Sequence, residues 1–276
     1  MTGLIDVGGG MRDIYGAGAL DYFLDNNISF DVCIGVSAGS ANIASFLAGQ
    51  RGRTYSFYAE YAKRKEYMSF SNLFRNGSYF DLDYIYSFLS NEDGEYPIDF
   101  KTLSENTSAY YIVVTDAKTG EPVYLPKHII TKNNLWALKA SCAMPVACQP
   151  ISRDDGIYFD GGVSDPIPVQ KALELGCDKV YVIIPRPATK KNREFSSFMK
   201  PFLSKYPHVL NLMKRRPEIY NNQLQTLEHY IKKGQVVLIA PDNDYDVNMM
   251  TRDSRKLDNF YKKGYDDAKK AFESQL

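Results

Sequence analysis

The sequence predicts an α/β fold: a three-layer sandwich with a central, mostly parallel sheet flanked by helices. Apolar runs of strand length alternate with longer helix-compatible runs in the first half of the chain, which is the order that βα units produce. The runs at 110–115, 179–185 and 235–240 are almost wholly apolar, a pattern typical of strands buried on both faces. We therefore expect helices on both sides of one sheet.

The order of elements follows from these runs and from the residues that interrupt them. Apolar residues recur at helical spacing in 14–26, whereas Pro145 and Gly176 end later helices. A turn at 118–120 allows residues 121–125 to pair with the strand before them. The expected strands are 4–7, 31–34, 110–115, 121–125, 156–159, 179–185 and 235–240, and the expected helices are 14–26, 38–49, 134–142, 169–175 and much of 195–233.

Composition excludes several classes of protein. The 276 residues carry 33 Lys and Arg against 33 Asp and Glu, so the chain lacks the basic excess of a nucleic-acid-binding protein. Its cysteines form no C-x-x-C pair, so we expect no metal site, no disulfide and no cofactor (Cys33, Cys142, Cys148 and Cys177). Neither a secretory signal nor an apolar run of membrane-spanning length is visible, so we expect a cytoplasmic protein.

The segment Gly35-Val36-Ser37-Ala38-Gly39 has the pattern G-x-S-x-G and lies between an apolar run and a helix-compatible run. Strand, sharp turn and helix are the context of a nucleophile elbow, in which glycines permit a strained backbone and the serine hydroxyl stands above the sheet edge. A serine held in this way attacks acyl carbons. A plain turn of small residues is the alternative interpretation.

Three consecutive glycines, Gly8, Gly9 and Gly10, follow the first predicted strand and precede the first predicted helix. Without side chains their N–H groups can point outward together, and the following helix adds positive dipole, as an oxyanion hole requires. A phosphate could occupy the same loop, but the dinucleotide-binding pattern needs glycine where this chain has Asp13. A plain tight turn is the third interpretation.

Asp160-Gly161-Gly162 follows a short predicted strand, and the carboxyl ends of strands form the edge at which α/β sheets build their sites. The glycines remove bulk beside the carboxylate, so Asp160 is a candidate base for Ser37; an Asx turn that closes the strand is the alternative. None of the three histidines lies in a glycine turn (His128, His208 and His229). We therefore expect Asp160 to act on Ser37 directly rather than through a histidine.

These motifs, in this order, resemble the patatin-like phospholipase family over residues 3–185. The family's oxyanion loop matches Gly8 to Arg12, its nucleophile elbow Gly35 to Gly39, its A-S-x-A-x-P segment Ala140 to Pro145, and its D-G-[GA] motif Asp160 to Gly162. The resemblance implies a patatin-like fold and a Ser–Asp dyad, with Ser37 as nucleophile and Asp160 as base. It also implies supporting roles for Gly35, Ala38, Gly39, Gly161 and Gly162. The family's loop normally ends in Arg/Lys-Gly, from which Asp13 departs.

The resemblance implies a serine acyl hydrolase that acts on lipid or other carboxylic esters, of the phospholipase A or lysophospholipase type. The alternatives are an acyltransferase or thioesterase on the same dyad, and a non-catalytic lipid-binding module, which only the negative charge of Asp13 near the oxyanion site suggests. We expect a catalytic domain over 3–185 and a mainly helical C-terminal extension over 186–276, with one added strand, packed on the same domain. Within it, 185–193 is the expected link and the amphipathic stretch 252–274 an expected docking helix.

Residues 55–88 are unusually aromatic, and basic residues lie among them. Aromatic and basic side chains together suit a lipid–water boundary. We therefore expect a cap that lines an acyl channel or contacts a bilayer, which would make the protein peripheral at a membrane; packing of two amphipathic helices is the alternative. A lipid or ester substrate is the expected partner, nucleic acid is not, and the sequence leaves the oligomeric state open.

Overall fold

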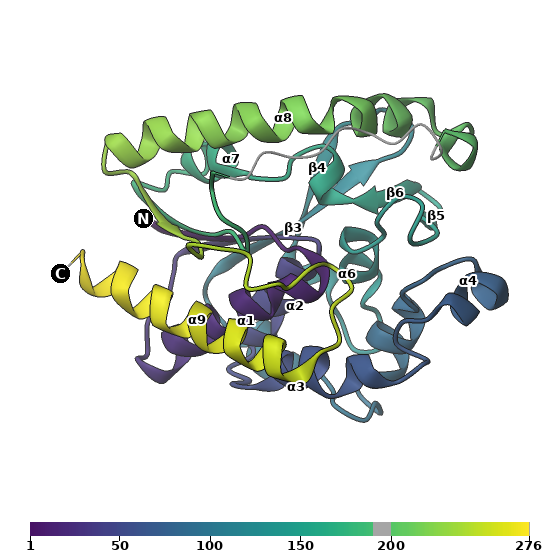
Figure 1. Ribbon diagram of the computed structural model, residues 1–276, viewed down its shortest axis with the longest axis horizontal. Coiled ribbons are helices and arrows are strands. Elements are labelled where there is room, and N and C mark those ends of the chain that lie inside the picture. The colour runs from purple at the N-terminus through teal and green to yellow at the C-terminus, as the bar shows by residue number, and fades with distance from the viewer. Residues whose placement is uncertain (190–199, 276) are drawn as a thin grey trace.

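The computed structural model describes residues 1–189 and 200–275, which form a mixed eight-stranded sheet with helices on both faces (Figure 1). The strand order is β5-β6-β3-β2-β1-β7-β8, and β4 also pairs with β3. The strands are β1 (Thr2–Asp6), β2 (Val32–Val36), β3 (Ala109–Asp116), β4 (Pro122–Pro126), β5 (Ile151–Arg153), β6 (Gly156–Asp160), β7 (Lys179–Ile183) and β8 (Val236–Ile239).

The sheet is mostly parallel, as the sequence predicts. Strands β1, β2, β3, β7 and β8 run in one direction, whereas β4 and β6 are antiparallel to β3 and β5 is antiparallel to β6. The helices are α1 (Ile14–Asp25), α2 (Ala38–Leu47), α3 (Arg53–Ala59), α4 (Phe70–Asn76), α5 (Phe100–Glu105), α6 (Trp136–Ser141), α7 (Val169–Glu174), α8 (Pro207–Lys232) and α9 (Ser254–Glu273), with a π-helical turn at Tyr84–Leu89. The predicted α/β sandwich is therefore confirmed.

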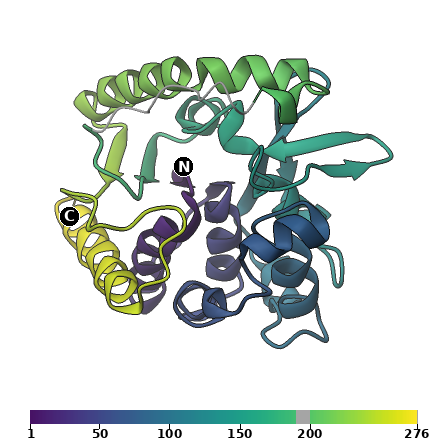
Figure 2. The same ribbon diagram turned by 45° about the vertical axis from the view of Figure 1, so that its right-hand side comes forward.

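A large hydrophobic core lies on each face of the sheet, and a smaller one packs Phe159 of β6 against Val209 of α8. Successive side chains of a strand point to opposite faces, so Leu4 belongs to the core shared with α1, α2 and α9, whereas Ile5 belongs to the core shared with α7 and α8. Figure 1 shows α8 and α7 above the sheet and α1, α2 and α9 below it, and Figure 2 shows the same layers after a turn of 45° about the vertical axis. Both faces are therefore apolar, which explains the almost wholly apolar strand sequences.

Several short elements of the structure were not specified by the sequence. Residues 51–105 form α3, a 3₁₀ turn (Tyr61–Lys63), α4, the π-helical turn and α5. Strand β5 was not expected, since it has three residues, of which two are exposed. Helix α8 begins at Pro207, a residue suited to the first helical position. Residues 190–199 of the expected link and helix lie outside the described residues.

The C-terminal helix α9 packs on α1, as its amphipathic sequence predicts. The two backbones approach so closely that a β-carbon on Gly264 would lie 1.9 Å from the Tyr15 carbonyl oxygen, and one on Gly18 would lie 2.0 Å from the Tyr261 carbonyl oxygen. Tyr15 and Phe260 fill the space beside this crossing, with ring centroids 5.1 Å apart. Within the described ranges, no helix is both long and apolar enough to cross a bilayer.

We predict that Gly264→Ala destabilises the protein by at least about 1–3 kcal/mol, because the new methyl group meets backbone that cannot move aside as a side chain can. Thermal and urea unfolding followed by circular dichroism measure the change. The exposed Lys269 on the same helix provides the control: Lys269→Ala should alter the free energy of unfolding by no more than about 0.5 kcal/mol. Equal stability of Gly264→Ala and the parent chain would contradict the close crossing.

Candidate active site

Strands β2 and β6 meet end to end along one edge of β3. The register pairs Val36 with Val113 and Asp160 with Val114, whereas β4 pairs with Tyr111 to Thr115. Since a strand has two edges and β4 spans both pairing regions, β2 and β6 must share the edge opposite to β4. The parallel strand β2 ends where the antiparallel β6 ends, so the residues that follow Val36 and close β6 are brought together.

Ser37 and Asp160 occupy this junction. The Ser37 hydroxyl donates a hydrogen bond of 2.6 Å to Asp160 Oδ2, although the two residues lie 123 positions apart in the chain. Ser37 has φ 55° and ψ −133°, a region that residues with a side chain rarely occupy. A β-carbon on Gly35 would lie 2.4 Å from the Ser40 α-carbon, so the sharp turn requires glycine there.

The carboxylate of Asp160 is buried and fixed from several sides. Its Oδ1 accepts a 2.7 Å hydrogen bond from the Gly162 amide, and its backbone amide donates to the Ala143 carbonyl. Burial raises the pKa of Asp160 above its ordinary value, while the hydrogen bonds from Ser37 and Gly162 and the positive charge of Arg216 oppose that rise. A carboxylate in this environment can accept a proton from the hydroxyl that it contacts.

Ser141 holds the elbow in place, a role that the sequence did not assign. Its hydroxyl accepts a 2.9 Å hydrogen bond from the Ser37 amide and donates one of 2.7 Å to the Val113 carbonyl. The Ser37 amide is therefore occupied and is not a free donor for an oxyanion. The A-S-x-A-x-P segment marked Ser141, but only the fold brings α6 beneath the elbow.

The glycine loop lies beside Ser37, and its three glycines have positive φ values of 68°, 155° and 61°. A β-carbon on Gly8 would lie 2.2 Å from the Val36 carbonyl oxygen and 2.9 Å from the Ser37 β-carbon, so the loop can contact the elbow only as bare backbone. The Gly8 amide donates to Asp6 Oδ1 at 3.2 Å. Neither the Gly9 nor the Gly10 amide donates to an acceptor in 1–189 or 200–275. Two donors of the loop are thus unoccupied.

A buried pair of carboxyl groups, Asp6 and Asp13, supports this loop. Asn42 Nδ2 donates to Asp6 Oδ2 at 3.1 Å and to Asp13 Oδ2 at 2.9 Å, and both aspartates are fully buried. Burial raises the pKa of Asp6 to about 6, and burial together with the charge of Asp6 raises the pKa of Asp13 well above its ordinary value. Asp13 directly precedes α1, makes no side-chain cap hydrogen bond and does not line the cavity described below. Its carboxyl group contacts Asn42 instead.

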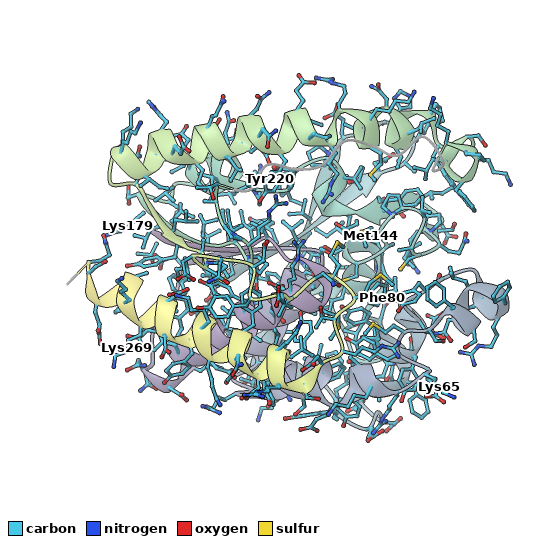
Figure 3. The ribbon with its side chains drawn as sticks, viewed as in Figure 1. Lys65, Phe80, Met144, Lys179, Tyr220 and Lys269 are labelled. Atoms are coloured by element: carbon cyan, nitrogen blue, oxygen red, sulfur yellow. The ribbon has the colours of Figure 1, made fainter. Side chains whose placement is uncertain are left out.

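Ser37, Asp160 and Gly10 line one cavity of about 80 Å³. Its walls are mainly aromatic and aliphatic side chains of the cap and of the turn after α6, among them Phe80 and Met144, which Figure 3 labels. Of the aromatic residues in 55–88, those that line it are Phe57, Tyr58, Tyr67, Phe80 and Tyr86. The nucleophile elbow thus opens into an apolar space of the kind that binds small apolar ligands.

The three histidines lie outside the cavity, whereas Cys142 is part of its lining. His128, His208 and His229 are absent from the cavity lining; His208 and His229 lie at the two ends of α8. All four cysteines are free. Among the described residues, no group of three or more His, Cys, Asp or Glu side chains is placed to hold a metal ion.

Ser37 has a strained backbone between a strand and a helix, and its hydroxyl is hydrogen-bonded to a buried aspartate at the edge of an α/β sheet. This arrangement defines the class of α/β proteins with a nucleophile elbow. The family model described as patatin-like phospholipase matches residues 7–173, more than half of the chain, and a domain of unknown function, DUF6363, matches residues 206–276. The chain belongs to the patatin-like phospholipase family and is, as a member, a carboxylic ester hydrolase.

Two curated proteins and one solved structure are similar to the chain. The uncharacterized protein YjjU of Escherichia coli (strain K12) is 29% identical over 248 residues, which cover 86% of this chain and 68% of that protein. The probable lipid hydrolase 463L of Invertebrate iridescent virus 6 is 27% identical over 184 residues, which cover 62% of this chain and 63% of that protein. VipD from Legionella pneumophila is 14% identical with a TM-score of 0.49, over 99% of this chain and 67% of that one.

We predict that the Asp6–Asp13 pair makes the protein less stable as pH rises from about 4 through about 6. Both pKa values are higher in the folded chain than the ordinary value of about 3.9 in the unfolded chain. The folded state therefore binds more protons, and the free energy of unfolding falls as they are lost. Asp13→Asn, which keeps a donor beside Asp6, should flatten this part of the curve in urea unfolding at a series of pH values.

The control for this prediction is the exposed Asp266 of α9, for which Asp266→Asn should keep the shape of the wild-type curve. An unchanged slope between pH about 4 and 6 in Asp13→Asn would show that the pair does not share a proton.

Proposed function

We propose that the protein hydrolyses lipid esters through a Ser37–Asp160 dyad, with the glycine loop at Gly8 to Gly10 as the oxyanion hole. The observation that carries the proposal is the 2.6 Å hydrogen bond from the hydroxyl of a strained Ser37 to a buried Asp160. Unoccupied amides of the loop and an apolar cavity lie at the same place. Nucleophile, base, oxyanion donors and a binding space are the four parts that acyl transfer to serine needs.

The reaction follows from these positions. Asp160 takes the hydroxyl proton as Ser37 Oγ attacks the ester carbonyl carbon, and the amides of Gly9 and Gly10 stabilise the oxyanion. The proton then passes to the leaving alkoxide, and an acyl-serine remains. Water, deprotonated by Asp160, attacks the acyl-serine and releases the acid and the free hydroxyl. Because only ionised Asp160 can act as base, the rate should rise with pH through a pKa above the ordinary aspartate value.

Two features support a lipid as the substrate. The cavity beside Ser37 is walled mainly by aromatic and aliphatic side chains, which suit an acyl chain rather than a polar acyl group. One relative also carries the name probable lipid hydrolase. An acyltransferase or thioesterase would use the same dyad, so adding lysolipid or alcohol acceptors and analysing the products distinguishes hydrolysis from transfer.

The proposed catalytic unit is residues 3–185, and 186–276 is proposed as an extension of the same domain. In support, β8 pairs with β7 as an edge of the one sheet, and Arg216 of α8 donates a 3.0 Å hydrogen bond to the carbonyl of Gly162. The Met11 amide donates to the carbonyl of Met249, so the extension also contacts the glycine loop.

We predict that Ser37→Ala removes esterase activity, and that Asp160→Asn lowers kcat by about 10²–10⁴-fold, because the base that accepts the serine proton is lost. The rate of p-nitrophenyl ester hydrolysis measures this, and mass spectrometry after fluorophosphonate treatment should find label on Ser37. Replacing His128, His208 or His229 with Gln should leave turnover largely intact. Full activity in Asp160→Asn would sink the dyad, and a loss above about 10³-fold in a histidine variant would revive a triad.

We also propose that the cap contacts a membrane surface through α4. Phe70 and Phe74 are 68% and 93% exposed and lie one turn apart on this helix, which projects from the body of the molecule (Figure 1). The exposed Lys63 and Lys65 precede the helix, and basic and aromatic side chains together favour anionic lipid surfaces. Arg64, by contrast, is paired with Glu95.

Replacing Phe70 and Phe74 with Ser should weaken cosedimentation with phosphatidylglycerol vesicles by about 10-fold or more, since each phenyl ring that enters the bilayer contributes about 1.5–3 kcal/mol. Hydrolysis of a soluble short-chain ester should stay unchanged, because neither ring lines the cavity. Vesicle binding equal to that of the parent chain would rule out contact through α4.

A further inference from the structure

Arg53, the first residue of α3, is a buried cation without a buried anion beside it. Its side chain is 3% exposed. The guanidinium donates to Ser45 Oγ at 3.0 Å, to Ser90 Oγ at 2.9 Å and to the Tyr96 carbonyl at 2.8 Å, while its Nε has no partner among the described residues. Every acceptor is neutral, and in the described part of the chain no carboxylate oxygen lies within 4.0 Å of the guanidinium.

The groups around Arg53 compensate only part of the free-energy cost of burying its charge. The guanidinium lies over the Phe57 ring, 4.4 Å from its centroid, and 5.6 Å from that of Tyr96. Burial lowers the pKa of Arg53 to about 10, so the group remains positive at neutral pH. Buried charges are normally paired, so a guanidinium that has only neutral acceptors and an unused N–H among the described residues is suited to bind an anion.

Arg53 lines the same cavity as the nucleophile. Ala38, Ala41 and Asn42, on one face of α2, form part of the lining between them. Ser45, which binds the guanidinium, follows Ser37 by eight positions, so it lies about 12 Å further along the helix axis. Among the described residues that line the cavity, Asp160 is the one with a carboxyl group and Arg53 is the one with a guanidinium group. Arg53 therefore binds α2 about two helical turns beyond Ser37, and both residues line the one cavity.

We propose that the cavity accepts esters whose acyl chain ends in a carboxylate, with the ester carbonyl at Ser37 and the carboxylate on Arg53. The proposal rests on the proposed esterase function and adds the class of acyl group. An extended chain advances about 1.2 Å per bond, and a charge-assisted hydrogen bond spans about 2.8 Å of the distance. Half-esters of dicarboxylic acids with about six to nine carbons therefore fit the separation.

The test compares two esters that differ in one end group. p-Nitrophenyl hydrogen suberate carries the terminal carboxylate, and p-nitrophenyl octanoate has the same chain length without it. Wild-type enzyme should prefer the suberate, and Arg53→Met should lower kcat/KM for the suberate about 10- to 100-fold, chiefly through KM, because one charge-assisted interaction is lost. The octanoate should change by less than about 3-fold. Arg53→Lys, which keeps the charge, should retain most of the preference.

Arg51 supplies the matched control, because it lies two residues earlier and is half exposed, and its charge is paired with Asp25. Arg51→Met should leave both rates unchanged. A wild-type enzyme without preference for the suberate, or an Arg53→Met variant that loses both activities equally, would mean that Arg53 only joins α2 to the cap. A preference for 4-carboxyphenyl octanoate over phenyl octanoate, with none for the suberate, would place the anion on the alcohol side and overturn the acyl assignment.

A binding experiment separates this inference from the proposed hydrolysis. Isothermal titration of Ser37→Ala with monomethyl suberate, compared with the Ser37→Ala/Arg53→Met double variant, measures the contribution of Arg53 without turnover. We expect Kd to rise about 10- to 100-fold in the double variant. If Kd rises in this way while the wild-type protein turns over neither ester, the inference stands and the proposed function fails. Equal Kd values in the two variants would overturn the inference even if the wild-type protein is an active esterase.

Discussion

The shared edge of β3 is the constraint on which the site depends. Parallel β2 occupies the first part of this edge and antiparallel β6 the second, so their carboxyl ends face each other at Val113 and Val114. Ser37 and Asp160 therefore meet because of strand register rather than sequence proximity. Ser141 bonds to both the elbow and Val113 and so fixes the same junction from below. A slip of one residue in β6 would turn the aspartate to the opposite face of the sheet.

Burial in apolar surroundings changes the pKa values and the interactions of the ionisable groups around the site. Burial raises the pKa of Asp160, while the hydrogen bonds from Ser37 and Gly162 and the charge of Arg216 oppose that rise. Asp6 accepts a hydrogen bond from the Gly8 amide, whereas the amides of Gly9 and Gly10 donate to no acceptor among the described residues. Burial also strengthens the attraction between an anion in the cavity and Arg53, which has no carboxylate oxygen within 4.0 Å in the described part of the chain.

The C-terminal part of the chain contributes to the site although none of the predicted site residues belongs to it. Helix α8 contacts Gly162 through Arg216, and the carbonyl of Met249 accepts from the amide of Met11 at the end of the glycine loop. Helix α9 packs on α1, the helix that follows this loop. The backbone that carries the proposed oxyanion donors is therefore held between the sheet and a segment more than 200 residues later in the chain.

The sequence determined the fold class and the residue types of the site, because both depend on local patterns. Apolar runs specified buried strands, and bare glycines specified where the backbone must turn sharply, as at Gly8 and Gly35. Local pattern could not locate Ser141 beneath the elbow, join Asp13 to Asp6, or reveal that Arg53 and Ser37 line one cavity. Those relations connect distant residues through strand register and helix packing, so only the tertiary structure decided them.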